Sequence, residues 1–102
     1  MLHETVNRVA VLETGELFLG LASHRNSSYQ YVYREAAGVY WDAERAGFKS
    51  TPMEKWSSQI WFKHIVSVVN SGLGVSLTLG ELVAWENIPE NEITEIKKEN
   101  AF

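Results

Sequence analysis

Residues 51–72 read TPMEKWSSQIWFKHIVSVVNSG, and this stretch decides the predicted fold. Thr51 stands at an N-cap position, Pro52 at the first helical position and Glu54 three residues after the cap, which is the pattern of a capping box. Gly72 is placed to end the helix. The sequence therefore predicts a helix from Pro52 to about Ser71.

The predicted helix has a narrow polar side. On a helical wheel its polar residues form one stripe, made of Gln59, Lys63, Ser67 and Asn70. The apolar side chains spread over the rest of the circumference, namely Trp61, Phe62, Ile65, Val66, Val68 and Val69. A helix of this kind has to be covered on more than one side, so we expect it at the centre of the domain.

Residues 8–22 predict a β-hairpin that turns at Thr14-Gly15, because Gly15 supplies the positive φ of a tight turn. Two sets of side chains then alternate between the faces: Val9, Val11, Phe18 and Gly20 on one, and Ala10, Leu12, Leu17 and Leu19 on the other. Since both faces carry aliphatic residues, we expect core on one side and another element or subunit on the other.

Residues 29–48 favour a second hairpin with aromatic-rich strands, turning near Ala36-Ala37-Gly38 after a polar loop at 23–28. The competing interpretation is a helix from Ala36 to Ala46 that Gly47 ends.

A third hairpin, 75–79 with 82–86, is predicted around Gly80-Glu81. A short acidic helix from about Glu90 to Glu99 follows, anchored by two residues, Ile93 and Ile96.

These elements predict one α+β domain over residues 1–102. Its antiparallel sheet is built from three hairpins packed on one long central helix, with a short C-terminal helix, in the order ββββαββα. A chain of 102 residues is too short for two independent cores. A hydrophobic fraction of 45% is typical of a globular protein.

The net charge is -4 and the basic residues are scattered apart from Lys97-Lys98, so we expect no nucleic-acid partner. A basic partner suits this charge better.

The chain has no cysteine, which fits a reducing compartment. It shows no signal peptide and no apolar run long enough for a membrane helix, so we expect a cytoplasmic protein without a membrane partner.

The most distinctive cluster of side chains lies in the predicted second hairpin. It holds all four tyrosines together with one tryptophan and two acids: Tyr29, Tyr31, Tyr33, Tyr40, Trp41, Asp42 and Glu44. A two-residue turn sets Tyr33 opposite Asp42 and Tyr31 opposite Glu44, which predicts an acidic aromatic surface for a cation or a basic protein. A three-residue turn sets Tyr33 against Trp41 instead, which is ordinary sheet packing.

Catalytic signals are weak. Asp42 and Glu44 have a spacing that suits paired carboxylates, but acidic pairs on surfaces are far commoner than catalytic ones. His64 lies in the apolar arc of the helix and reads as a core histidine, unless the helix covers the face of Asp42 and Glu44. Trp56, Trp61 and His64 are candidates for the lining of a pocket. No cofactor and no metal site are expected.

We therefore expect a non-enzymatic binding protein, a homodimer, that presents the acidic aromatic surface to a basic protein or a cationic ligand. The alternative is a small-molecule-binding protein or simple acid-base enzyme with an aromatic pocket between helix and sheet. By analogy, a short acidic domain without catalytic motifs suits a bacterial accessory, immunity-like or mobile-cassette-like role.

Overall fold

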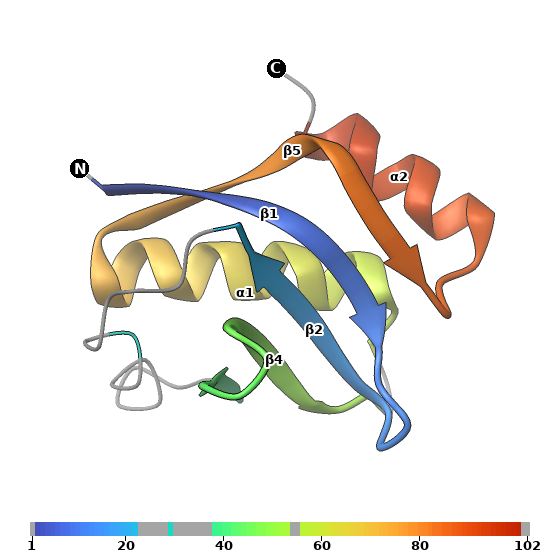
Figure 1. The fold of residues 1–102 in the computed structure, drawn as a ribbon. Helices are drawn as coiled ribbons and strands as arrows, with labels where there is room; N and C mark the ends of the chain where they lie inside the picture. The colour runs from blue at the N-terminus through green and yellow to red at the C-terminus, as the bar shows by residue number, and fades with distance from the viewer. Residues whose placement is uncertain (1, 23–28, 30–37, 54–55, 101–102) are drawn as a thin grey trace.

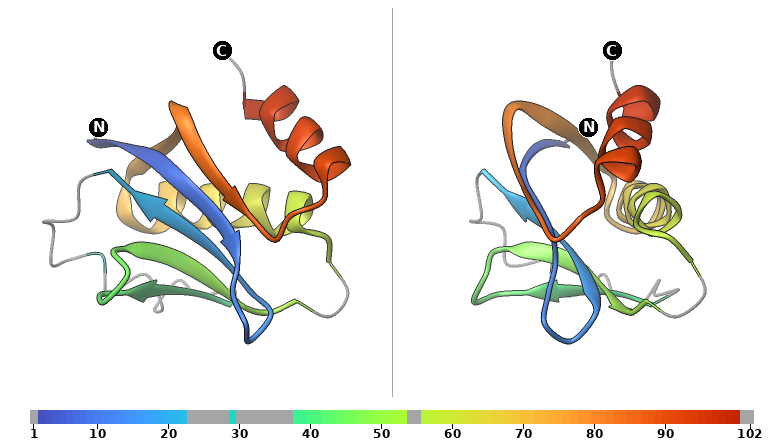
Figure 2. Two further views of the ribbon diagram at one scale, coloured as in Figure 1. Left: turned by 45° about the vertical axis from the view of Figure 1, so that its right-hand side comes forward. Right: turned by 90° about the vertical axis from the view of Figure 1, so that its right-hand side faces the viewer.

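The computed structural model of the protein describes residues 2–22, 29, 38–53 and 56–100, and its centre is one mixed five-stranded sheet (Figure 1). The strands are β1 (Leu2–Val11), β2 (Glu16–Leu21), β3 (Val39–Asp42), β4 (Gly47–Pro52) and β5 (Val75–Glu86), arranged in space as β3-β4-β2-β1-β5. The helices are α1 (Ser58–Leu73) and α2 (Glu90–Asn100). Both lie on the same face of the sheet (Figure 2).

The predicted third hairpin is wrong, and with it the fold of three hairpins on one long central helix. Residues 75–86 form the single strand β5, which runs parallel to β1. Parallel neighbours cannot be joined by a tight turn. The chain therefore leaves β4, passes through α1 across β2 and β1, and enters the sheet beside β1. The order is ββββαβα, an α+β fold with a mixed sheet and two helices.

Gly80, which predicted a turn, marks an irregularity in β5 instead. Val6 pairs with Leu79 but Arg8 pairs with Ala84, so β5 holds extra residues at this point, which is a bulge. A Cβ on Gly80 would lie 2.9 Å from Cγ2 of Thr5, so the glycine also allows β1 to approach closely. Figure 1 shows β5 bending midway along its length. The same residue type suits a turn and a bulge, and local sequence does not separate them.

Helix α1 begins later than predicted. Pro52 is the last residue of β4 and pairs with Glu16, so the pairing of β4 with β2 takes the residues that resemble a helix start. Ser57 is the N-cap instead, and its side chain accepts a hydrogen bond from the Ile60 N–H at 3.3 Å. The helix ends after Leu73, where Gly74 has a φ of 67°.

β3 and β4 form a hairpin that turns at 43–46, within the residues predicted as the second strand of the second hairpin. β3 pairs antiparallel with β4, from Val39 with Ser50 to Asp42 with Gly47. The alternative helix over 36–46 is therefore wrong from residue 39 onward. Most of the predicted first strand and its turn, residues 30–37, lie outside the described residues, as does the polar loop at 23–28.

The first hairpin forms as predicted around Gly15, but its faces differ. Val11 pairs with Leu17 and Ala10 with Phe18, because the loop has three residues rather than two. A shift of one residue moves every side chain of a strand to the other face. Leu17 and Leu19 therefore point with Val9 toward the helices, and Phe18 points away.

The outer face of the hairpin is covered within the chain. Phe18 is fully buried although it points away from the helices. Its ring lies over Gly20 and Gly47, and the guanidinium carbon of Arg8 is 5.4 Å from the ring centroid. Arg8 is held in place by Glu86 of β5, at 2.5 Å. Side chains of the sheet itself therefore bury this face, where another element or subunit was expected.

The core lies between the sheet and the helices. α1 contributes five buried apolar side chains, namely Trp61, Phe62, Ile65, Val68 and Val69, and α2 contributes Ile93 and Ile96. α2 is docked firmly, since Glu92 accepts a hydrogen bond from the Ser58 N–H at 2.8 Å. Neither helix among the described residues is long and apolar enough to cross a membrane.

Replacing Gly47 with alanine is expected to lower the free energy of unfolding by about 3 kcal/mol, because overpacking a buried site forces its neighbours to move. A Cβ there would lie 2.3 Å from the Leu19 carbonyl oxygen and 2.6 Å from the Phe18 ring. Gly74→Asn is the control, since its site has open space and asparagine tolerates a positive φ. Equal urea midpoints for the two variants would contradict the packing of Phe18.

The observed start of α1 predicts that Ser57→Ala lowers the free energy of unfolding by about 1 kcal/mol, the usual effect of removing an N-cap side chain. Thr51→Val removes the hydroxyl of the expected cap but keeps a β-branched residue in β4, and it should leave stability nearly unchanged. Urea denaturation of both variants measures the difference. A larger loss for Thr51→Val would place the helix start at Pro52 after all.

Candidate functional site

Two clusters hold most of the candidate residues. The first is an ion-pair network on the outer face of the sheet, made of Glu16, Asp42, Arg45 and Lys49, and is called the hairpin network. The second is a group of side chains at the start of α1, made of Trp56, Ile60, Trp61 and His64, and is called the Trp56 patch.

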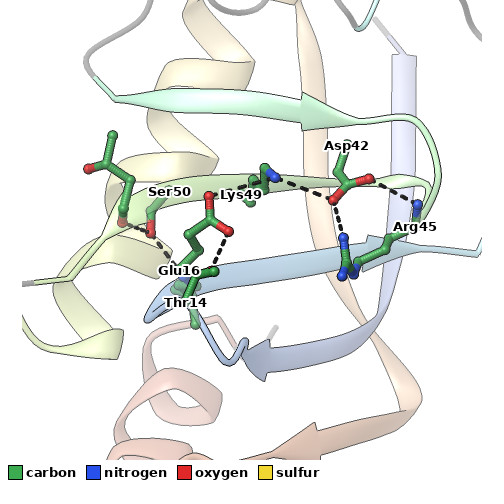
Figure 3. A network of polar contacts seen from close by, with 8 residues as sticks. Thr14, Glu16, Asp42, Arg45, Lys49 and Ser50 are labelled. Atoms are coloured by element: carbon green, nitrogen blue, oxygen red, sulfur yellow. Dashed lines mark hydrogen bonds and ion pairs between the residues drawn. The ribbon is translucent and has the colours of Figure 1, made fainter.

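The hairpin network neutralises the carboxylate that was predicted to face a cation. Asp42 is only 8% exposed, and its Oδ2 lies 2.9 Å from the Arg45 guanidinium and 3.4 Å from the Lys49 ammonium. Lys49 also reaches Glu16 at 3.6 Å. Figure 3 shows these groups in one line along β4. The network ties three strands together and offers no unpaired Asp42 carboxylate to a partner.

The pKa of Asp42 is lowered from its usual range. Burial acts most strongly and by itself would raise the pKa, but the Arg45 N–H, the Arg45 guanidinium and the Lys49 ammonium together outweigh it. The Asp42 Oδ1 accepts the Arg45 N–H at 3.1 Å, which closes the turn at 43–46. Asp42 is therefore a structural group of this turn.

The predicted tyrosine surface is divided by the sheet. Tyr29 is buried, donates its hydroxyl proton to Glu4 at 2.5 Å, and packs its ring 5.4 Å from that of Trp41. Trp41 also packs against Phe48 on the helix side, with ring centroids 5.0 Å apart. Both rings are thus part of the core packing.

The remaining members of that surface are not all described. Tyr40 is 42% exposed and lies with Asp42 on the outer face, on the opposite side from Trp41. Glu44 is exposed in the turn at 43–46, so it does not share a strand face with Asp42. Tyr31 and Tyr33 lie outside the described residues.

The predicted pocket residues do come together, as packed rings. The ring centroid of Trp56 is 4.8 Å from that of Trp61 and 5.1 Å from that of His64, and Trp61 and His64 are 5.4 Å apart. Trp61 is buried, and a Cβ on Gly38 would lie 3.0 Å from its ring. These contacts fill the space between the rings.

The outer part of the Trp56 patch is exposed. Trp56 is 43% and Ile60 49% exposed, and they stand four residues apart at the start of α1. The sequence-based reasoning missed Ile60 as a site residue. Its spacing from Trp56 could have found it, because residues four apart share a helix face.

Asp42 and His64 do not form a general-base pair. Asp42 points away from the face of the sheet that α1 covers, and its oxygens are engaged by Arg45 and Lys49. In the part of the chain that the structure describes, no three histidine or carboxylate side chains converge as a set of metal ligands.

The lowered pKa of Asp42 predicts a pH-dependent effect of Asp42→Asn. A folded-state pKa below the unfolded value means that the carboxylate stabilises the fold above about pH 4, and that this stability is lost as pH falls through the folded pKa. We expect the variant to lose about 2 kcal/mol in urea denaturation at pH 7 and much less at pH 3. Glu44→Gln, in the same turn but exposed, is the control. An equal loss at both pH values would show that charge is not the cause.

Comparison with known proteins places the chain in a family. No curated protein sequence matches it. A solved structure from the mobile metagenome of North West Arm Sewage Outfall, described as Integron Cassette Protein Hfx_Cass5, is 28% identical to it, covering 100% of this chain and 99% of that chain, with a TM-score of 0.45. The model of the same family matches residues 8–82. Because that match spans well over half of the chain, this protein belongs to the integron cassette protein family Hfx_Cass5.

Proposed function

We propose that this cassette protein is a non-enzymatic binding protein of the cytoplasm, that it works as a homodimer, and that its Trp56 patch receives a basic side chain of a protein partner. The observation that carries the proposal is the exposure of two large apolar side chains at the start of α1, Trp56 just before its N-cap and Ile60 in its first turn. Binding energy at protein interfaces concentrates in a few such aromatic and aliphatic anchors.

The indole of Trp56 is held before any partner arrives. Trp61, itself buried, and His64 pack against it on the inner side. A side chain that is already ordered loses little conformational entropy on binding, so more of the contact energy appears as affinity. This supports Trp56 as an anchor rather than as an incidental exposed residue.

The chemistry of the patch favours a cation. An exposed indole face attracts guanidinium and ammonium groups, and the chain as a whole carries a charge of -4. Glu99 accepts a hydrogen bond from Gln59 at 3.1 Å, which adds a carboxylate at the first turn of α1. An arginine of a partner can stack on the exposed face of Trp56.

A binding role is also favoured over the acid-base alternative. The groups that a hydrolytic or proton-transfer site would need are separated: Asp42 is ion-paired on one side of the sheet, and His64 packs between rings on the other. Among the described residues β5 pairs with a strand on one side only, and this supports the homodimer because a free strand edge tends to pair.

The test is titration of a hexa-arginine peptide into the protein at low salt, followed by calorimetry. Wild-type protein should bind, and Trp56→Ala should weaken the affinity about 10-fold, the effect of losing one anchor. Raising the salt concentration should weaken wild-type binding as well. Lys63→Glu, which exchanges an exposed cation near the patch for an anion, should strengthen it.

Tyr40→Ala is the matched control, because Tyr40 is about as exposed as Trp56 but lies on the outer face of the sheet. This variant should bind like wild type. Equal affinities of the Trp56 and Tyr40 variants, or no binding by wild type, would remove the proposed surface.

A further inference from the structure

We infer that two copies of this chain pair through the free edge of β5, with Val75–Leu79 of each copy antiparallel about a two-fold axis at Leu77. This inference rests on the homodimer of the proposed function and assigns its interface. β5 lies at one end of the strand order, and in the described part of the chain β1 is the strand that pairs with it. On the side of β5 away from β1, alternate residues therefore point their backbone N–H and C=O groups out of the sheet.

The two edges of the sheet differ in how they are protected. Natural edge strands avoid pairing by being short, charged, bulged or interrupted by proline. β3, at the opposite edge, has four residues and ends in the ion-paired Asp42. The second half of β5 has its bulge after Leu79, and it carries Glu81 and Glu86.

Residues 75–79 have none of these protections. The segment reads VSLTL, without charge, proline or bulge, and pairs regularly with β1 from Leu2↔Val75 to Val6↔Leu79. Val75 and Leu77 are buried on the helix side, whereas Ser76 and Thr78 are half-buried on the other face. A regularly paired, uncharged strand of this kind offers its free edge as a template for another strand.

A second copy fits this edge by symmetry. A two-fold axis perpendicular to the sheet places the helix-side residues of one copy beside the helix-side residues of the other. It therefore pairs odd-numbered residues with odd-numbered ones and even-numbered with even-numbered ones. Centred on Leu77, it sets Val75 opposite Leu79 of the partner and Ser76 opposite Thr78 of the partner. Each pair matches in polarity, and paired hydroxyl residues are favourable neighbours across strands.

The contact is modest in size. Five residues per copy bury less than the roughly 1,200 Å² of a standard stable interface, so we expect a dissociation constant in the micromolar range. Analytical ultracentrifugation of the wild type from about 1 to 500 μM should therefore show a monomer–dimer equilibrium.

A pair of double variants tests the assigned register. Ser76→Lys with Thr78→Lys places like charges opposite each other twice and should raise the dimer dissociation constant at least about 10-fold. Ser76→Lys with Thr78→Glu places opposite charges together twice and should keep the dimer or strengthen it. Both side chains are on the half-exposed outer face, and thermal melting confirms that both variants fold.

Each outcome decides a different point. A monomeric wild type at all concentrations, or two double variants that dimerise like wild type, would overturn the β5 interface. Dissociation of both double variants would overturn pairing about Leu77. Trp56→Ala should leave the dimer intact, so loss of the dimer in that variant would assign self-association to the Trp56 patch instead. Failure of peptide binding with an intact dimer would contradict the proposed function and would leave the β5 interface unaffected.

Discussion

The parallel pairing of β1 with β5 is the constraint on which the rest of this structure depends. It joins the two ends of the chain in one sheet, and it cannot be made by a hairpin. The link from β4 to β5 therefore has to cross two strands, and α1 is that link. In crossing, α1 covers Leu17, Leu19 and Phe48 and forms the core with them.

The same constraint sets where the protein can meet other molecules. Because α1 and α2 share one face, the other face has to be closed by side chains of the sheet itself, which Phe18 does over two glycines. The crossing helix begins outside the sheet, so Trp56 and Ile60 are left exposed at its start. In the part of the chain that the structure describes, the sheet then ends on β5, whose first half has an edge without charge, proline or bulge. Both proposed contacts are thus by-products of one topology.

Sequence was a good guide where the decisive interactions are local. The turn at Gly15, the apolar side of α1 and the two isoleucine anchors of α2 follow from turn chemistry and helical periodicity. Contacts between distant segments decided the rest. Pro52 belongs to β4 because Glu16 pairs with it, and Gly80 belongs to a bulge because β1 lies against it. Neither partner can be read from the residues around these positions.

The candidate site divides in the same way. Trp56, Trp61 and His64 could be grouped from spacing near one helix end, and the structure brings them together. The predicted acidic surface depended on a turn at 36–38 and on free carboxylates. The turn at 43–46 takes Glu44 out of the strand, and Arg45 and Lys49 engage the Asp42 carboxylate. Predicting these ion pairs requires the register of the strands. The sequence allowed two loop lengths, and each gives a different register.

Nuclear Overhauser contacts between backbone protons test the central pairing most directly. Strands β1 and β5 in parallel register should give contacts between Thr5 and Thr78 and between Val9 and Trp85, since these are opposed residues. Contacts between Leu77 and Ala84 in their place would show that residues 75–86 fold back as a hairpin, and the crossing role of α1 would then be wrong.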